Sequence, residues 1–214
     1  ESKAALRHDW TWWGRPEQIW RPGDEIYTVY PWGRGGGKTF TGAHGSHYVA
    51  HHPELCGGRP AEGPDDRRAG EGAVMAIAGR TANDVNQTMI DGDSGIMAVC
   101  DPALRPEWRK SDRLLVWPTG VKARLMSADV PDSFRGPNFG WFWADEWAHW
   151  KRLRKAWQQL RLTHRLAAPG QHPAHLHIDL LPRLQRGVAR QHVGTALERA
   201  PVLAARHHLL PGVA

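Results

Sequence analysis

Apolar residues in this chain fall in short runs separated by glycine, proline and charged residues, as expected for strands alternating with helices. The segment Ile26–Tyr30 is β-branched and aromatic, and the continuous apolar runs Ala73–Ala78 and Phe139–Ala144 are typical of strands buried on both faces. Arg113–Trp117 and Val121–Met126, joined by Pro-Thr-Gly, predict a hairpin whose second strand alternates polar and apolar positions.

Three segments, each following one of these strands, are predicted to be helices. The first runs from Lys38 to about His52, and the second starts at Thr81 and continues to about Ile90. The third covers Trp147 to Leu162, where large apolar residues recur at core spacing: Trp150, Leu153, Trp157 and Leu160. The pattern therefore predicts an α/β chain with one mainly parallel sheet.

The last 51 residues differ in kind from the rest. All twelve tryptophans and all six lysines precede residue 158, whereas residues 164–214 hold seven of the thirteen histidines. No helical or strand periodicity continues there. We therefore expect residues 1–163 to form the domain and residues 164–214 to be a poorly ordered tail, with out-of-frame translation as a hypothesis for its origin.

The segment Gly33-Arg34-Gly35-Gly36-Gly37-Lys38-Thr39 follows the first strand and opens the first helix, which is the context of a phosphate-binding loop. Glycines allow successive backbone N–H groups to converge on one anion. Lys38 can then reach the β and γ phosphates of ATP, and the Thr39 hydroxyl can bind Mg²⁺. The general pattern has glycine where this chain has Trp32, so a glycine-rich turn without a ligand is the alternative.

The apolar run Phe139–Ala144 ends in Asp145-Glu146, which is the second half of an ATPase site. Asp145 would orient Mg²⁺, and Glu146 would act as the general base on the attacking water. Two ordinary surface acids at the end of a buried strand are the alternative. The order favours the functional interpretation, because the separation from Thr39 leaves room for further strands of the same sheet.

Composition narrows the class of protein further. At 214 residues the chain suits one domain, and no apolar stretch approaches the ~20 residues of a membrane span.

The chain has two cysteines, and they lack the spacing of metal ligands, which favours a reducing compartment. The start at Glu1 suggests an N-terminally trimmed fragment. The net charge is +6, but residues 164–214 contribute +4 of it, so charge alone does not establish DNA binding.

Two further candidates carry weaker signals. Gln18, in Arg15-Pro16-Glu17-Gln18 before the first strand, could pair with an adenine edge, although a solvated turn fits the same spacing. His44, His47 and His51 share one face of the first predicted helix. A polar outer helix face is favoured over metal binding, because no cysteine or acid completes a ligand set.

These residues resemble the ATPase region of the large terminase subunit of tailed bacteriophages and prophages, over roughly residues 10–163. Several ordered motifs carry the resemblance: Arg15–Gln18, Gly33–Thr39, Gly79-Arg-Thr-Ala-Asn-Asp84, Trp117-Pro-Thr-Gly120, Ser127–Pro137 and Trp143-Ala-Asp-Glu-Trp147.

The resemblance implies a three-layer P-loop fold and a motor that hydrolyses ATP to move double-stranded DNA into a procapsid. It also implies an oligomeric ring, a portal and a small terminase subunit as partners, and a location in the host cytoplasm and at the procapsid, without a membrane. By position, Arg34 matches a loop arginine that senses the γ phosphate. Arg135 matches an arginine finger acting on a neighbouring subunit, with a turn arginine bound to a carboxylate as the alternative.

Two departures limit the resemblance. Family members place a Thr/Ser-rich, proline-terminated strand end after the Asp-Glu helix, whereas residues 172–182 contain no Thr or Ser, so the fold is expected to be incomplete at its C-terminus. The clustered acids of the family's nuclease domain are also absent. A helicase-like translocase and a non-catalytic nucleotide-binding remnant therefore remain open as alternatives.

Overall fold

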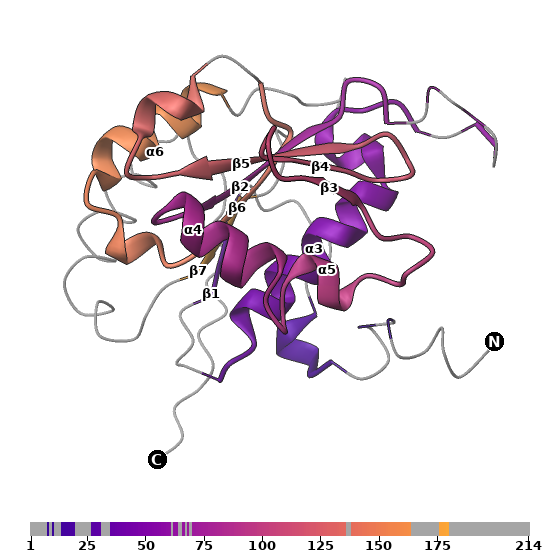
Figure 1. The fold of residues 1–214 in the computed structure, drawn as a ribbon, viewed down its shortest axis with the longest axis horizontal. Helices are drawn as coiled ribbons and strands as arrows, with labels where there is room; N and C mark the ends of the chain where they lie inside the picture. The colour runs from indigo at the N-terminus through magenta and orange to yellow at the C-terminus, as the bar shows by residue number, and fades with distance from the viewer. Residues whose placement is uncertain are drawn as a thin grey trace.

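The computed structural model describes residues 8, 10, 14–19, 27–30, 35–60, 62, 63, 66, 68, 70–135, 138–163 and 176–179. Within this part, seven strands form one sheet in the order β1-β7-β6-β2-β5-β4-β3 (Figure 1). The strands are β1 (Tyr27–Tyr30), β2 (Val74–Gly79), β3 (Glu107–Arg109), β4 (Leu114–Val116), β5 (Lys122–Ser127), β6 (Trp141–Ala144) and β7 (Leu176–Asp179).

The sheet is mainly parallel, as the sequence predicts. The pairs β1–β7, β7–β6, β6–β2 and β2–β5 are parallel, and β5–β4 and β4–β3 are antiparallel. Parallel neighbours place their carboxyl ends at one edge of the sheet, where open α/β sheets bind their ligands. The predicted hairpin is confirmed as β4 and β5, and β3 extends it.

Helices and short turns connect the strands. The α-helices are α3 (Lys38–His51), α4 (Ala82–Asp84), α5 (Ile96–Val99) and α6 (Leu153–Thr163), and a π-helix, η3 (Val85–Ile90), continues α4. The 3₁₀ turns are η1 (Pro16–Gln18), η2 (Pro53–Cys56), η4 (Pro131–Phe134) and η5 (Trp147–His149). In the described part, no helix is long and apolar enough to cross a bilayer.

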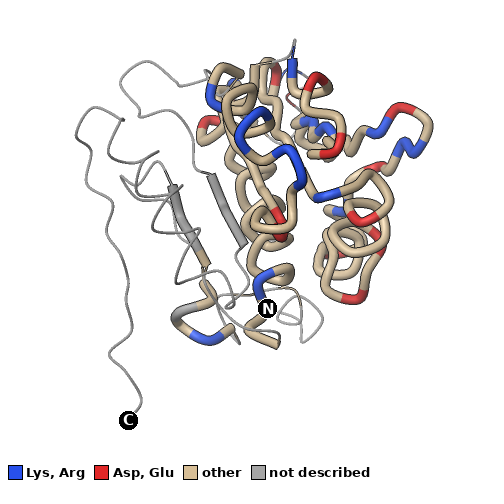
Figure 2. The backbone as a smooth tube through the Cα atoms, turned by 90° about the vertical axis from the view of Figure 1, so that its left-hand side faces the viewer, with Lys and Arg blue, Asp and Glu red and all other residues tan. Residues whose placement is uncertain are grey.

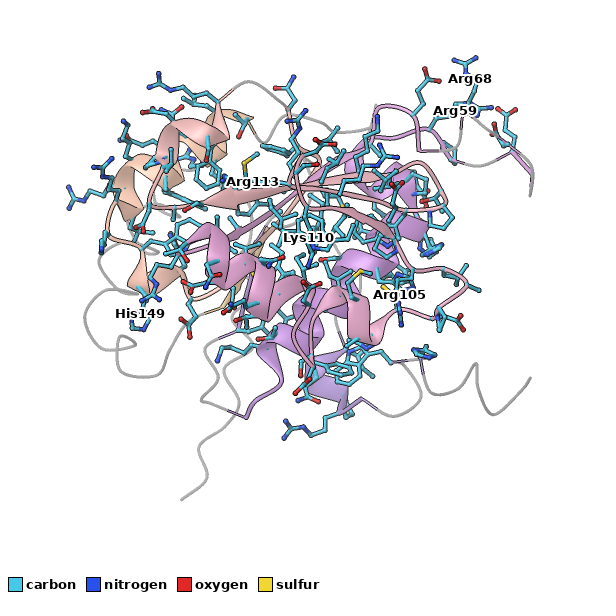
Figure 3. The ribbon with its side chains drawn as sticks, in the orientation of Figure 1. Arg59, Arg68, Arg105, Lys110, Arg113 and His149 are labelled. Carbon is cyan, nitrogen blue, oxygen red and sulfur yellow. The ribbon has the colours of Figure 1, made fainter. Side chains whose placement is uncertain are left out.

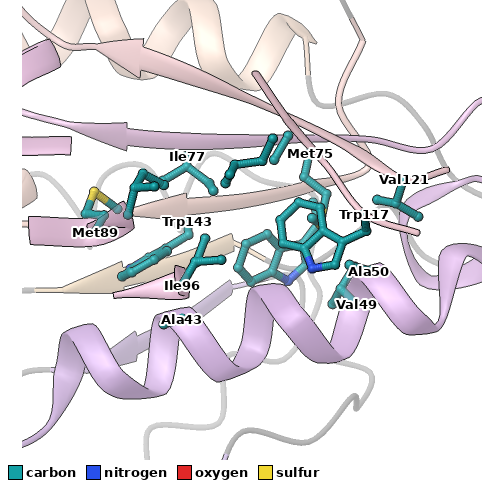
Figure 4. Packing of buried hydrophobic residues seen from close by; sticks show 14 of the residues in the cluster. Ala43, Val49, Ala50, Met75, Ile77, Met89, Ile96, Trp117, Val121 and Trp143 are labelled. Carbon is teal, nitrogen blue, oxygen red and sulfur yellow. The ribbon is translucent and has the colours of Figure 1, made fainter. Parts of the chain in front are cut away.

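Each face of the sheet has its own core. On one face, side chains of β2 and β6 pack with α3, α5 and η3, and Figure 4 shows this cluster around Met75, Ile77 and Trp143. On the other face, Ala76 and Phe142 belong to a second cluster with α6 and η4. Because successive strand residues point to opposite faces, both faces of β2 and β6 are buried. The chain therefore has helix, sheet and helix layers.

The third predicted helix is interrupted. Residues 147–149 form η5, Trp150 is extended (φ −73°, ψ 113°), and α6 begins only at Leu153. The break lets Trp150 bury its ring and donate from Nε1 to the carbonyl oxygen of Asp145, at 3.1 Å. Tertiary packing against the end of β6 thus overrides the continuous helical spacing.

Strand β7 lies in the segment that the sequence assigns to the tail. Residues 176–179 alternate apolar and polar residues over only four positions, and they pair with β1 on one side and β6 on the other. Pairing on both sides satisfies backbone groups whatever the side chains are. These four residues thus belong to the sheet, and the rest of 164–214 lies outside the described residues, so the division into a domain of residues 1–163 and a poorly ordered tail stays a prediction.

Candidate nucleotide-binding site

The phosphate-loop segment has the backbone that its glycines permit. Gly35 (φ 76°) and Gly37 (φ 81°) adopt left-handed conformations, which strongly favour glycine. Gly37 is the N-cap of α3, and its carbonyl accepts from the backbone N–H of Thr41 at 2.9 Å. The helix therefore begins at Lys38, as predicted, with its N-terminal N–H groups at the loop. Gly33 and Arg34 lie outside the described residues.

Gln18 lies directly against this loop. Its side-chain amide donates to the carbonyl oxygen of Gly36 at 2.6 Å, and its Oε1 accepts from the backbone N–H of Arg15 at 3.4 Å. Gln18 is buried, and a Cβ at Gly37 would overlap its amide nitrogen. Gln18 is thus part of a packed contact between η1 and the loop, which a solvated turn would not provide.

The two acids stand at the carboxyl end of β6, and the backbone separates their environments. Asp145 is 8% exposed, and its backbone N–H donates to Ala78 of β2 at 2.9 Å. Glu146 is exposed and adopts φ 48°, an uncommon conformation for a residue with a Cβ. This turn sends the chain away from the sheet immediately after Asp145, so one acid is buried and the next faces solvent.

A pocket of about 860 Å³ joins the loop to the acids. It is lined by Gly35, Gly36, Gly37, Lys38, Thr39, Phe40, Gly79, Arg80, Asp84, Gln87, Thr88, Met89, Gly92, Asp93, Ser94, Asp145 and Glu146. Predicted site residues that are far apart in the sequence, Lys38 with Thr39 and Asp145 with Glu146, therefore face one cavity. Its volume is in the range of small-molecule sites.

The residues that follow β2 form one wall of this pocket, and their sequence did not indicate a role for them. Arg80 and Asp84 form an ion pair there, with Arg80 Nε 2.9 Å from Asp84 Oδ2. The pKa of the Asp84 carboxyl lies below its ordinary value, chiefly because Arg80 donates to it. Thr81 caps α4 by accepting from the backbone N–H of Asp84 at 3.1 Å. Polar residues directly after a buried strand were the sequence signal for this wall.

Arg135 does not line the pocket. It ends η4 on the face that carries α6, where its Nε lies 3.2 Å from Gln159 Oε1 and 3.3 Å from Asp132 Oδ1. Lys155 shares Asp132, with Nζ 3.0 Å from Oδ2. The guanidinium is therefore held at the surface, in contact with a carboxylate and an amide.

The histidines of α3 take part in packing. The rings of His44 and Trp10 are stacked with centroids 5.0 Å apart, and His47 Nδ1 lies 3.0 Å from Cys100 Sγ and 3.3 Å from Trp117 Nε1. Burial, with a smaller contribution from His51, lowers the pKa of His47 to about 4. Over the part of the chain that is described, no three His, Cys, Asp or Glu side chains are grouped so as to hold a metal ion.

Charges of both signs are distributed over the described surface. In Figure 2, basic and acidic residues are interspersed along the tube. Of the cations labelled in Figure 3, Lys110 and Arg113 lie in the turn between β3 and β4, whereas Arg59 lies in the loop before β2. Several are paired with acids, as in Arg59–Asp66 and Lys110–Asp91. This distribution agrees with the low net charge that the sequence gives for residues 1–163.

Solved structures with a similar arrangement are phage large terminases. The large terminase of a thermophilic bacteriophage has a TM-score of 0.47 at 14% identity, covering 84% of this chain and 38% of that one. A complex of the same terminase with ATP-γ-S gives 0.44 at 15% identity, with 84% and 37% covered. The ATPase domain of the Thermus phage P74-26 large terminase gives 0.41 at 15%, with 72% and 58% covered.

The chain thus spans less than two thirds of the length of each of these chains. No curated protein matches its sequence. The family model described as "Terminase large subunit, T4likevirus-type, N-terminal" matches residues 30–167, more than half of the chain, and this range includes the phosphate loop, the Arg80 wall and the two acids. The chain belongs to this terminase large subunit family.

Proposed function

We propose that this chain binds ATP with Mg²⁺ in the pocket and hydrolyses the ATP, and that hydrolysis drives double-stranded DNA into a procapsid. One observation carries the proposal: Lys38 and Thr39, from one end of the chain, line the same pocket as Asp145 and Glu146, more than 100 residues later. An anion-binding loop and a pair of acids in one cavity are the two parts that phosphoryl transfer to water requires.

The loop would bind the phosphates. The left-handed glycines Gly35 and Gly37 free the backbone N–H groups of the loop, including that of Gly36, to point at an anion, and the start of α3 adds the positive end of its dipole. Lys38 supplies a full positive charge beside them. We place Gly33 and Arg34 in the same cradle by the family pattern, with Arg34 as a γ-phosphate contact.

Thr39 and Asp145 fit a magnesium ion. Both offer oxygen to the pocket, and Mg²⁺ is usually held by one or two carboxylates together with substrate phosphates and water. The burial of Asp145 keeps its carboxylate close to the end of β6. When bound, the ion would neutralise charge on the phosphates.

Glu146 is our candidate for the general base. It would accept a proton from the attacking water as that water's oxygen bonds to the γ phosphorus and the bond to the bridging oxygen of ADP breaks. Its exposed position in the pocket wall, next to buried Asp145, gives the two acids different roles. The left-handed backbone at Glu146 is the type of local strain found at functional sites.

Other proposed roles extend beyond this pocket. Gln18 would contact the adenine, while its amide also holds the Gly36 carbonyl. Arg135, which is not among the residues that line its own pocket, would act as a finger on the pocket of a neighbouring copy. By membership of the family, we also propose that the chain acts in a homo-oligomeric ring and that its partners are a portal and a small terminase subunit. It would be located in the host cytoplasm and attach transiently to the procapsid.

Steady-state ATP hydrolysis tests the proposal with two matched pairs of variants. Lys38→Ala and Glu146→Gln should each lower turnover by about 10²–10⁴-fold, because each removes a group from phosphate binding or proton transfer. Lys110→Ala and Glu107→Gln remove exposed residues of the same types outside the pocket and should leave turnover unchanged. Turnover that survives both pocket variants would falsify the site assignment.

One sequence observation favours a second candidate, a nucleotide-binding protein without turnover. Residues 172–182 contain no Thr or Ser to serve as the hydroxyl-bearing strand end that couples hydrolysis to movement in the family. ATP binding that Lys38→Ala abolishes, with no hydrolysis in the wild type, would identify this candidate. DNA-stimulated hydrolysis without strand separation would instead identify a packaging motor and exclude a helicase-like translocase.

A further inference from the structure

Arg80 is a second cation in the pocket, and neither the loop nor the acid pair accounts for it. Among the described lining residues, Lys38 and Arg80 are the basic side chains, against the acids Asp84, Asp93, Asp145 and Glu146. Lys38 lies at the start of α3, whereas Arg80 follows β2, the neighbour of the strand that carries the acid pair. The pocket therefore offers positive charge from two separate elements.

The backbone of Arg80 is hydrogen-bonded to the end of β5 and to the residues that follow it. Its carbonyl oxygen accepts from Ser127 Oγ at 3.3 Å and from the backbone N–H of Asp129 at 3.2 Å. These bonds tie the carboxyl end of β5 to that of β2. Arg80 thus stands on rigid scaffold at the edge of the sheet where the acids of β6 also emerge.

The side chain of Arg80 is held by a contact that a phosphate could replace. Its Nε and Nη2 donate to Asp84 Oδ2 and Oδ1 at 2.9 and 3.4 Å. Both side chains are partly exposed, 46% for Arg80 and 36% for Asp84. Exposed ion pairs contribute ~0–1 kcal/mol, whereas a guanidinium binds phosphate through two charge-assisted hydrogen bonds in the same fork geometry.

We propose that Arg80 makes this pocket distinguish a nucleoside triphosphate from a diphosphate, by exchanging its ion pair with Asp84 for the terminal phosphate. The inference rests on the proposed function, since it assumes that the pocket holds a nucleotide. In the absence of nucleotide, Asp84 holds the guanidinium at the wall. The terminal phosphate, which only the triphosphate has, supplies the oxygens that draw it away.

Equilibrium binding of ATP-γ-S and of ADP, each with Mg²⁺, tests this role. Arg80→Ala should weaken ATP-γ-S binding by about ten- to a hundredfold and ADP binding by less than about threefold, because the lost hydrogen bonds go to the terminal phosphate. Arg80→Lys keeps the charge without the fork and should lie between Arg80→Ala and the wild type.

Asp84→Asn separates this role from a structural one. Releasing Arg80 from its partner should leave ATP-γ-S binding unchanged or tighten it by up to about fivefold, opposite in direction to Arg80→Ala. If the pair only stabilises α4, both variants should weaken both nucleotides alike. Arg109→Ala is the matched control, since Arg109 pairs with Glu107 on β3, is 46% exposed like Arg80 and lies outside the pocket.

The outcomes separate this inference from the proposed function. Equal effects of Arg80→Ala on ATP-γ-S and ADP, or no effect on either, overturn the role of Arg80. If Lys38→Ala still abolishes binding in that case, the nucleotide pocket itself stands. A wild-type protein that binds neither nucleotide overturns both proposals.

Discussion

The phosphate loop is attached to the sheet on its two sides in different ways. The strand before it, β1, pairs with β7, and this is a backbone attachment. The helix after it, α3, packs against β6 so closely that a Cβ on Gly42 would overlap the indole of Trp143. Strand β6 therefore positions the loop through the packing of its side chains against α3. Strand β7 positions the same loop through the backbone hydrogen bonds that it shares with β1.

The sequences of the two strands reflect this difference. Trp141–Ala144 is apolar at every position, fully buried, and followed by the acid pair. Leu176–Asp179 alternates apolar and polar residues over only four positions and is followed by Leu-Leu-Pro. Side-chain packing selects particular residues, whereas backbone pairing needs only N–H and C=O groups, so a central strand can have a much shorter sequence signal than its neighbour.

Trp143→Ala should have the largest effect on stability. The indole is fully buried between the sheet and α3, and its removal should cost about 3–5 kcal/mol of unfolding free energy. Urea denaturation measures this loss. Leu162→Ala, at a side chain that is 54% exposed, is the control and should change stability by less than about 0.5 kcal/mol.

Ile178→Pro tests the ladder attachment. Proline removes a backbone donor from a strand that is paired on both sides, which should cost about 3 kcal/mol and speed hydrogen exchange of the β1 amides. Ile178→Val keeps the donor and serves as the control. Unchanged stability and exchange would mean that the packing of α3 alone holds the loop.

Gly42→Ala tests the packing attachment without removing any atoms. The added methyl overlaps Trp143, so α3 must shift, at a cost of about 1–3 kcal/mol. The shift should also weaken nucleotide binding, because α3 begins in the phosphate loop. Gly63→Ala meets no atom within 4 Å and should be neutral in both measurements.

The pH dependence of stability gives the smallest effect. His47, on α3, accepts from Trp117 Nε1, and burial lowers its pKa to about 4. The unfolded chain, with a histidine pKa near 6.5, therefore binds more protons between these values, so stability is complete above about pH 6.5 and declines towards pH 4. The loss between pH 7 and pH 5 should be about 2 kcal/mol.

Comparing denaturation of the wild type with that of His47→Gln measures this contribution. The substitution should flatten the profile in that pH window, even if it lowers stability overall. A slope that persists in His47→Gln would assign the pH dependence to other groups.

Most of the fold followed from local pattern. The buried runs of β2 and β6, the β4–β5 hairpin and the start of α3 each have a period, a turn or a glycine that predicts them. The interruption at Trp150 was not predicted, because it depends on how the indole packs against the end of β6. Strand β7 was not predicted, because four alternating residues form a strand here only between β1 and β6. In the pocket, Lys38, Thr39, Asp145 and Glu146 could be found from motifs, whereas Arg80 and Asp84 could not be given a role.

By itself, the sequence determined the chemistry available to this protein: a glycine-rich anion loop, two acids after an apolar strand, and the family in which these occur together. Only the tertiary structure decided which groups share a cavity, that Gln18 rests on the loop carbonyl, and that Arg80 faces the same pocket in an ion pair with Asp84. The reason is physical, because local backbone preferences are set by neighbouring residues. A site at the carboxyl edge of a parallel sheet is instead assembled from strand ends that meet only when the whole sheet forms.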